Sequence, residues 1–171
     1  EARSLLQSRG ALDTAGRITD HGRAIARLPL HPRLAHMLLR AGGTAAPLAA
    51  LLAERDPLRG APCDLTLRLR ALTSGGKGPG VLNRGALERV KTEARRLRKL
   101  APKSGADLSP AEAAALAYPD RIGLRRPGAA PRWLLSGGKG ASMSDSDPLA
   151  GQRLIVATDL DGDAREAKIR L

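Results

Sequence analysis

The sequence has almost no aromatic residues. Its 171 residues include no Phe, and only one Tyr and one Trp, at Tyr118 and Trp133. Proteins that hold single strands by stacking their bases need several aromatic side chains on one surface, so this scarcity argues against an aromatic-faced RRM or OB module. A core without aromatics has to consist of Leu, Ala, Val and Ile, and interiors of that kind come mostly from close-packed helices.

Cysteine and long apolar runs are also scarce. A single Cys63 cannot form an internal disulfide, which fits a reducing cytosol better than secretion. The longest apolar stretch covers only residues 47–53, far short of the roughly 18 to 20 residues of a membrane span, and no signal peptide is recognisable. We therefore expect a cytoplasmic protein. Because the sequence begins without Met inside an amphipathic run and ends in a strand pattern, we also expect a piece of a larger protein.

Positive charge, by contrast, is abundant and unevenly distributed. The chain has 29 Lys and Arg against 17 Asp and Glu, a formal net charge of +12. Residues 144–171 are net acidic, so the basic excess lies in residues 1–143. Such a surface gains affinity for polyanions by displacing their counterions, which makes nucleic acid a candidate partner. The preference for Arg over Lys is also what a GC-rich genome gives any protein, so composition alone leaves the partner open.

The first third of the chain has the pattern of part of a winged helix-turn-helix unit. Apolar spacing predicts a helix ending near Gly10, a short strand over 16–19, and a helix that begins at Thr19 or Asp20 and ends near Leu28. Helix, turn, short strand and helix within about 30 residues is the order of such a unit. Pro32 then opens a helix that ends before residues 42–43.

Three more helical segments are indicated in the middle of the chain. Residues 44–54 are apolar and predict a helix, whereas 64–72 are ambiguous, because the Leu residues alternate with polar ones as in a strand while Asp64 suits a helix N-cap. Residues 83–101 predict a long helix whose apolar residues step by three and four. Ser109 as N-cap, Pro110 and Glu112 form a capping box and predict a helix from 110 to about 118.

The last part of the chain has strand patterns instead. Residues 132–136 and 139–143 flank Gly137-Gly138, and residues 153–160 and 164–171 flank Asp161-Gly162, so two β-hairpins are predicted. The chain length suits one ordinary domain or a few small subdomains. We therefore expect a mainly α, α+β fold with a β-hairpin C-terminal part.

Neither phosphate-loop chemistry nor calcium binding is supported. Residues 74–80 and 136–142 both contain Gly-Gly-Lys-Gly but lack the earlier Gly and the Ser or Thr after Lys that a P-loop needs, so a flexible linker and a hairpin turn explain them better. Asp159, Asp161 and Asp163 imitate the opening of a calcium loop. Ala164 and Arg170 occupy the places where that loop needs Gly and Glu, which favours turn chemistry.

Zinc and catalytic sites are not indicated either. The candidate zinc ligands would be His21, His31, His36 and Cys63, but no pair has the usual ligand spacing, which favours capping or surface roles. No combination of residues suggests a catalytic centre. We therefore predict no catalytic residue, no metal and no cofactor in this chain.

The long helix over 83–101 carries the clearest binding candidate. Between residues 84 and 103, eight basic side chains face only Glu88 and Glu93. Pairs four residues apart, Arg84 with Glu88 and Arg89 with Glu93, would use both acids. That would leave Lys91, Arg95, Arg98 and Lys99 unpaired, the first three on one stripe. Such a stripe is either a solvated helix face or the contact for an anionic partner.

Several runs in the chain resemble the helicase-associated region of DEAH-box helicases, the bacterial HrpB type in particular. The matching runs are Gly10-Ala-Leu-Asp13, Gly16-Arg-Ile-Thr-Asp-His-Gly-Arg23, Leu28-Pro-Leu-His-Pro-Arg-Leu-Ala-His-Met-Leu-Leu39, Glu54-Arg-Asp-Pro57, Leu67-Arg-Leu-Arg-Ala71, Leu116-Ala-Tyr-Pro-Asp-Arg-Ile122 and Val156-Ala-Thr-Asp-Leu-Asp-Gly162. In the wider family Asp often stands where this chain has His31, which leaves the helix cap there open.

The resemblance implies a partial winged helix over 1–42, a helical ratchet-like bundle over 43–130 and the start of an OB-like β region over 131–171. It also implies that residues 64–72 are helical. ATP and Mg²⁺ would be bound by two RecA-like motor domains that this chain lacks, so the chain alone should not hydrolyse ATP although its parent helicase would. Those motor domains and single-stranded nucleic acid, most simply RNA, are the implied partners, and no membrane is involved.

In such helicases the accessory domains close a channel around the strand. Carried over, the resemblance makes Arg and Lys of the central helices a backbone-gripping surface that contacts phosphates rather than bases. The candidate residues are Lys91, Arg95, Arg98 and Lys99, followed by Arg125 and Arg126. Two alternatives remain, a free-standing winged-helix DNA-binding regulator and a protein-docking module without nucleic-acid contact.

Overall fold

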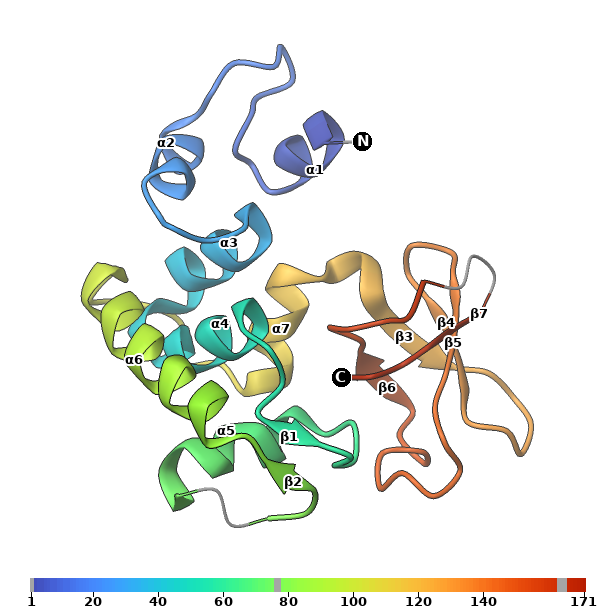
Figure 1. The fold of residues 1–171 in the computed structure, drawn as a ribbon. Helices are drawn as coiled ribbons and strands as arrows, with labels where there is room; N and C mark the ends of the chain where they lie inside the picture. The colour runs from blue at the N-terminus through green and yellow to red at the C-terminus, as the bar shows by residue number, and fades with distance from the viewer. Residues whose placement is uncertain (1, 76–77, 163–165) are drawn as a thin grey trace.

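The computed structural model describes residues 2–75, 78–162 and 166–171. Helices occupy the first two thirds of the chain and a sheet the last third, with α7 between the bundle and the sheet (Figure 1). The α+β class predicted from the sequence is confirmed. No helix in the described ranges is long and apolar enough to cross a membrane.

Glycine and threonine mark the boundaries of the first two helices. Helix α1 spans Ala2–Ser8 and is followed by Gly10 with a φ of 68°. Helix α2 spans Asp20–Ala26 and starts at Thr19, whose hydroxyl accepts from the Gly22 N–H. Instead of the predicted strand over 16–19, only an isolated bridge joins Leu12 and Ile18. The N–H groups of Asp13 and Thr19 donate to the Arg17 and Ala11 carbonyl oxygens on either side of the bridge, and the start of α2 at Asp20 ends the pairing there.

Helix α3 spans Pro32–Ala41, and its cap answers the question left by the sequence. The Nδ1 atom of His31 accepts a hydrogen bond from the Arg33 N–H at 3.3 Å, so an imidazole does what a carboxylate does at other N-termini. Leu34, Met37 and Leu38 lie on the buried face of α3. This face forms one side of the main core.

The helical bundle continues with a short 3₁₀ turn η1 (Gly42–Ala45) and helices α4 (Ala46–Ala53), α5 (Leu65–Ser74), α6 (Arg84–Leu100) and α7 (Pro110–Ala117). The α5 assignment settles the ambiguous segment as helix, with Asp64 as its N-cap. Helix α4 packs against α6, and α3 packs against α7. The apolar seam predicted for residues 83–101 is the buried face of α6: Leu87, Val90, Ala94 and Leu97.

Two very short strands pair at the two ends of the segment that contains α5. Strands β1 (Leu58–Arg59) and β2 (Val81–Leu82) pair antiparallel, and neither was predicted, because two residues carry no readable alternation. Beneath them Arg68 is fully buried and forms an ion pair with Asp56 at 2.8 Å. Its guanidinium also donates to the backbone oxygens of Pro62 and Asp64. The buried arginine thus fastens α5 to the segment that follows α4.

The second sheet begins after a 3₁₀ turn η2 (Pro119–Arg121). It contains β3 (Ile122–Arg125), β4 (Arg132–Leu135), β5 (Gly140–Ser142), β6 (Leu154–Val156) and β7 (Glu166–Lys168), in the order β6-β3-β4-β5-β7. The first predicted hairpin is confirmed, since β4 and β5 pair antiparallel with Trp133 opposite Ala141. Trp133 is completely buried and centres the core on this side.

The second predicted hairpin is confirmed only close to its turn, and its two strands pair elsewhere. Strand β6 pairs antiparallel with β3, and β7 pairs parallel with β5, so the two arms lie on opposite edges of the sheet. Near the turn the two arms do pair as a hairpin would, since Leu160 bridges Ile169 antiparallel. On either side of this bridge, the N–H groups of Asp161 and Arg170 donate to the Lys168 and Asp159 carbonyl oxygens. The physical reason is β3, which was not predicted: it supplies the edge on which β6 pairs. The sheet therefore begins at Ile122; the division into three domains stays a prediction.

Candidate nucleic-acid interface

A cleft of about 590 Å³ opens between α4, α5, α6 and α7. Three of the predicted contact residues, Lys91, Arg95 and Arg98, line it together. Helix geometry brings them to one side, because steps of four and three residues return to the same face. The predicted stripe therefore exists as one wall of a concave surface.

The pairing of that stripe differs from the prediction. Glu88 pairs with Lys91 at 2.9 Å, three residues away, and Glu93 pairs with Arg96 at 3.1 Å. Arg89 reaches across to Glu54, at the end of α4. Lys91 is therefore not unpaired as expected, because neighbours three residues apart on a helix are as close as those four apart.

Arg95 and Arg98 remain the less engaged cations of the cleft. Both are exposed, and the Arg95 Nε donates only to the Lys91 backbone oxygen, at 3.2 Å. Within the described part of the chain, Arg98 forms no ion pair or side-chain hydrogen bond. An exposed pair such as that of Lys91 contributes less than about 1 kcal/mol, so an arriving phosphate can replace Glu88 at little cost.

The other three candidates lie outside the cleft. Lys99 is exposed on α6 but does not line it. Arg125 lies on the sheet, where its guanidinium donates to the Ala150 and Ala129 backbone oxygens and covers the Trp133 ring at 5.9 Å. Arg126 is exposed beside it. The structure thus brings together three of the six predicted residues, and the remaining three stay predictions.

The wall opposite the cations was not foreseen. It includes Leu108, from the segment between α6 and α7, together with Leu69 and Leu72 of α5. This segment packs against the end of α3 at Gly105. The contact leaves no room for a side chain at that residue, because a Cβ there would lie 2.4 Å from the Ala41 carbonyl oxygen. No local sequence signal places residues 102–109 against α3.

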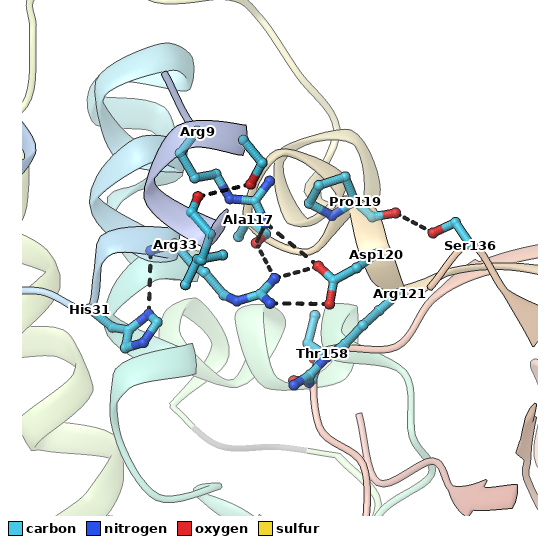
Figure 2. A network of polar contacts seen from close by, with 11 residues as sticks. Arg9, His31, Arg33, Ala117, Pro119, Asp120, Arg121, Ser136 and Thr158 are labelled. Carbon is cyan, nitrogen blue, oxygen red and sulfur yellow. Dashed lines mark hydrogen bonds and ion pairs between the residues drawn. The ribbon is translucent and has the colours of Figure 1, made fainter. Parts of the chain in front are cut away.

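A second polar cluster joins the first helices to the sheet (Figure 2). Arg33 of α3 donates twice to the Asp120 carboxylate, at 2.5 and 3.1 Å, and Arg9 lies 3.5 Å from the same carboxylate. Both arginines also donate to the Ala117 carbonyl oxygen at the end of α7. Sequence reasoning missed this cluster, because Arg33 and Asp120 are 87 residues apart.

Electrostatics in this cluster favour the charged carboxylate. Burial by itself would raise the pKa of Asp120, but the hydrogen bonds and charge of Arg33 outweigh it and hold that pKa below its ordinary value. Burial, with Arg33 nearby, lowers the pKa of Arg9. The Asp120 carboxylate and the Ala117 carbonyl oxygen engage both guanidinium groups, although the buried Arg9 Nε has no hydrogen-bond partner among the described residues. The role of the cluster is to position α1, α3 and η2.

Of the residues weighed as zinc ligands, the fold brings His21 and His36 together but gives His31 and Cys63 contacts elsewhere. His21 and His36 contact each other at 2.9 Å, His31 caps α3, and the Cys63 thiol donates to the Ile169 carbonyl oxygen. Burial raises the pKa of the Cys63 thiol to about 11. Among the residues that the structure describes, no three His, Cys, Asp or Glu side chains are grouped as a metal site would require.

Where the structure describes them, residues 136–142 and the aspartate-rich segment contain turns. Gly137 and Gly138 form the turn between β4 and β5. Residues 76–77 of the first segment and Asp163 lie outside the described residues. The Asp161 carboxylate accepts from the Lys168 N–H, as a turn residue does.

Comparison with solved structures shows which known proteins share this fold. The chain is similar to the E. coli DExH-box NTPase HrpB, with a TM-score of 0.75 and 31% identity over 99% of this chain. This resemblance to HrpB is confirmed. A second structure, of the E. coli DEAH/RHA helicase HrpB, gives a TM-score of 0.73 with 29% identity over 97% of this chain. The match agrees with the helicase-associated region that the sequence motifs indicated.

The chain spans about a fifth of those helicases, 20% of each. No protein-family model matches the sequence, and no curated protein does. The likeness to HrpB therefore rests on the motifs from Gly10 to Gly162 together with the fold. The HrpB chains are about five times as long as this one, so their activity is that of a much larger protein.

Proposed function

We propose that this chain is the accessory region of an ATP-dependent RNA helicase and grips the backbone of a single strand while RecA-like motor domains, which bind ATP and Mg²⁺, hydrolyse ATP. The observation that carries the proposal is the common placement of Lys91, Arg95 and Arg98 on one wall of a cleft in an HrpB-like fold. In this proposal residues 1–42, 43–130 and 131–171 act as the partial winged helix, the ratchet-like bundle and the start of the OB-like region.

The cleft suits a phosphate chain because of its charge. None of the described residues that line it is acidic, although the chain as a whole carries 17 Asp and Glu. Phosphate contacts bind a strand regardless of its sequence, which is what a protein that moves along nucleic acid requires. With Tyr118 packed under Arg33 and Arg121, and Trp133 buried, neither aromatic residue is available for stacking.

Charge reversal tests the proposal directly. The double variant Arg95→Glu and Arg98→Glu should weaken binding of a fluorescent single-stranded RNA 12-mer at least about tenfold. It should also reduce the salt slope by about 0.7 for each phosphate that the variant no longer neutralises. Anisotropy titrations between low and moderate salt measure both quantities. Arg27→Glu with Arg59→Glu is the matched control, because both residues are exposed and lie outside the cleft.

The same titrations separate the alternatives. Unchanged affinity at low salt in the Arg95 and Arg98 variant would remove the cleft from the binding surface. Tighter binding of duplex DNA than of single-stranded RNA would favour a winged-helix regulator. Unwinding that survives charge reversal in a longer helicase containing this region would favour a protein-docking role.

A further inference from the structure

The cleft beside α6 is apolar as well as basic. Its apolar wall includes Leu48 of α4, Leu69 and Leu72 of α5, and Leu108 before α7. Leu48 is 3% exposed, while the other three are half-buried and open towards the cleft. A surface that only gripped phosphates would have no need of leucines, because exposed apolar area of this kind is costly unless something covers it.

The charged side chains that line the cleft are all positive. Lys91, Arg95 and Arg98 supply positive charge, and the hydroxyls of Thr44 and Thr73 are the other polar side-chain groups among the described residues that line it. From residue 91 to residue 98 the helix rises about 10 Å, which is enough to contact phosphates on both sides of one nucleoside. The complementary ligand has an apolar body with anionic groups on either side.

We propose that the cleft receives one nucleobase of the bound strand, turned out of the stack, while Lys91 and Arg98, with Arg95 between them, hold the flanking phosphates. This inference rests on the function proposed above and adds to it a base contact. The cleft volume of about 590 Å³ lies in the range of pockets that enclose small ligands. Aliphatic side chains can cover the faces of a base by removing apolar area from water, so no aromatic platform is needed.

The contact is expected to accept any base. Base discrimination requires donors and acceptors placed against the base edges, and apart from the three cations the described residues of the cleft offer only the two threonine hydroxyls. Sequence-tolerant base burial fits a protein that advances along RNA. It also separates this inference from simple backbone gripping, because the bases themselves then contribute to affinity.

The experiment compares an intact single-stranded RNA 12-mer with a 12-mer of the same length in which every base is absent. The full 171-residue chain should bind the intact strand at least about tenfold more tightly, a ratio that corresponds to about 1.4 kcal/mol. Leu72→Ser and Leu108→Ser should bring this affinity ratio towards one. Leu67→Ser is the matched control: Leu67 is also a half-buried leucine of α5 but does not line the cleft.

Two further readouts make the outcomes distinct. Circular dichroism verifies that each serine variant is folded, and the variant of Leu108, which lies outside the helices, keeps the test open if the variant of Leu72 unfolds. The double variant Arg95→Glu and Arg98→Glu should lower the affinity for both strands by the same factor, so the affinity ratio should stay unchanged.

Equal affinity of the unaltered chain for the two strands would overturn the base contact and leave the proposed function intact. An equal fall of the ratio in the Leu67→Ser control would also overturn it. Failure of both strands to bind would overturn the proposed function and this inference together. Binding of an acidic amphipathic peptide in the cleft, with neither strand bound, would identify a docking surface instead.

Discussion

Asp120 is a single carboxylate shared by two arginines, Arg33 of α3 and Arg9 directly after α1. Arg33 has 18% of its side chain exposed and Arg9 only 5%, so without the carboxylate two poorly hydrated cations would face each other. Removing one partner of such a group costs more than the pair itself contributes, because the remaining charges are then left without compensation.

Asp120→Asn should lower the free energy of unfolding by about 1 to 3 kcal/mol at pH 7, a range reduced by the partial exposure of the carboxylate. The pKa of Asp120 is lowered in the folded chain from an ordinary 3.8, so its contribution is complete above about pH 4 and is lost as the pH falls through the lower folded value. Urea unfolding at pH 7 and pH 3 measures the change. Asp20→Asn, at a fully exposed carboxylate, should be nearly neutral.

His31 provides a second prediction at the scale of one residue. An aspartate at this N-cap would accept the Arg33 N–H and also add negative charge at the helix N-terminus. His31→Asp should therefore stabilise the chain by about 0.5 to 1 kcal/mol, whereas His31→Ala should destabilise it. Thermal unfolding of the three proteins gives the order, and an unchanged midpoint in both variants would show that the imidazole cap contributes nothing.

Among the secondary-structure elements, those with a local cause were predictable. Helix α6 follows from the spacing of its own apolar residues, and α7 from its capping box. The pairing of β6 and β7 depends on β3 and β5, which lie far away in the sequence. Likewise Lys91, Arg95 and Arg98 could be placed on one stripe, but the wall that contains Leu108 could not, because it is formed by tertiary packing.

The contact between α2 and α3 makes stability depend on pH. His21 and His36 meet edge to face, and burial, followed by the charges of His21, Arg9 and Arg40, lowers the pKa of His36 from 6.5 to about 4. The unfolded chain therefore takes up a proton between these values while the folded chain does not, so stability falls as the pH drops from 6.5 towards 4.

His36→Leu should flatten this decline, because it removes the group whose protonation opposes folding. Unfolding midpoints measured at intervals from about pH 7.5 to about pH 4.5 would show a shallower slope than in the unaltered chain. Met37→Leu is the matched control, because it changes a buried residue next to His36 without altering a titratable group, so its slope should match that of the unaltered chain. Identical slopes for all three proteins would mean that other groups govern the acid response.

Across the whole molecule, the cationic cleft and the net acidic end of the chain lie in different parts of the fold. The net acidic residues 144–171 contribute to the sheet, while the cationic cleft belongs to the helical bundle. The two parts are connected by side chains as well as by sequence, since the Cys63 N–H beside α5 donates to the Asp147 carboxylate. A likeness to HrpB over 99% of the chain is consistent with this arrangement acting as one unit.

Gly105 has a consequence for the size of the cleft. Its hydrogen atoms let residues 102–109 lie directly on the Ala41 carbonyl, and the same segment carries Leu108 into the cleft wall. Even a methyl group at residue 105 would force the segment outward, because a Cβ would also lie 2.6 Å from the Gly42 nitrogen. The width of the proposed binding cleft is therefore controlled from outside it, by the smallest side chain in the protein.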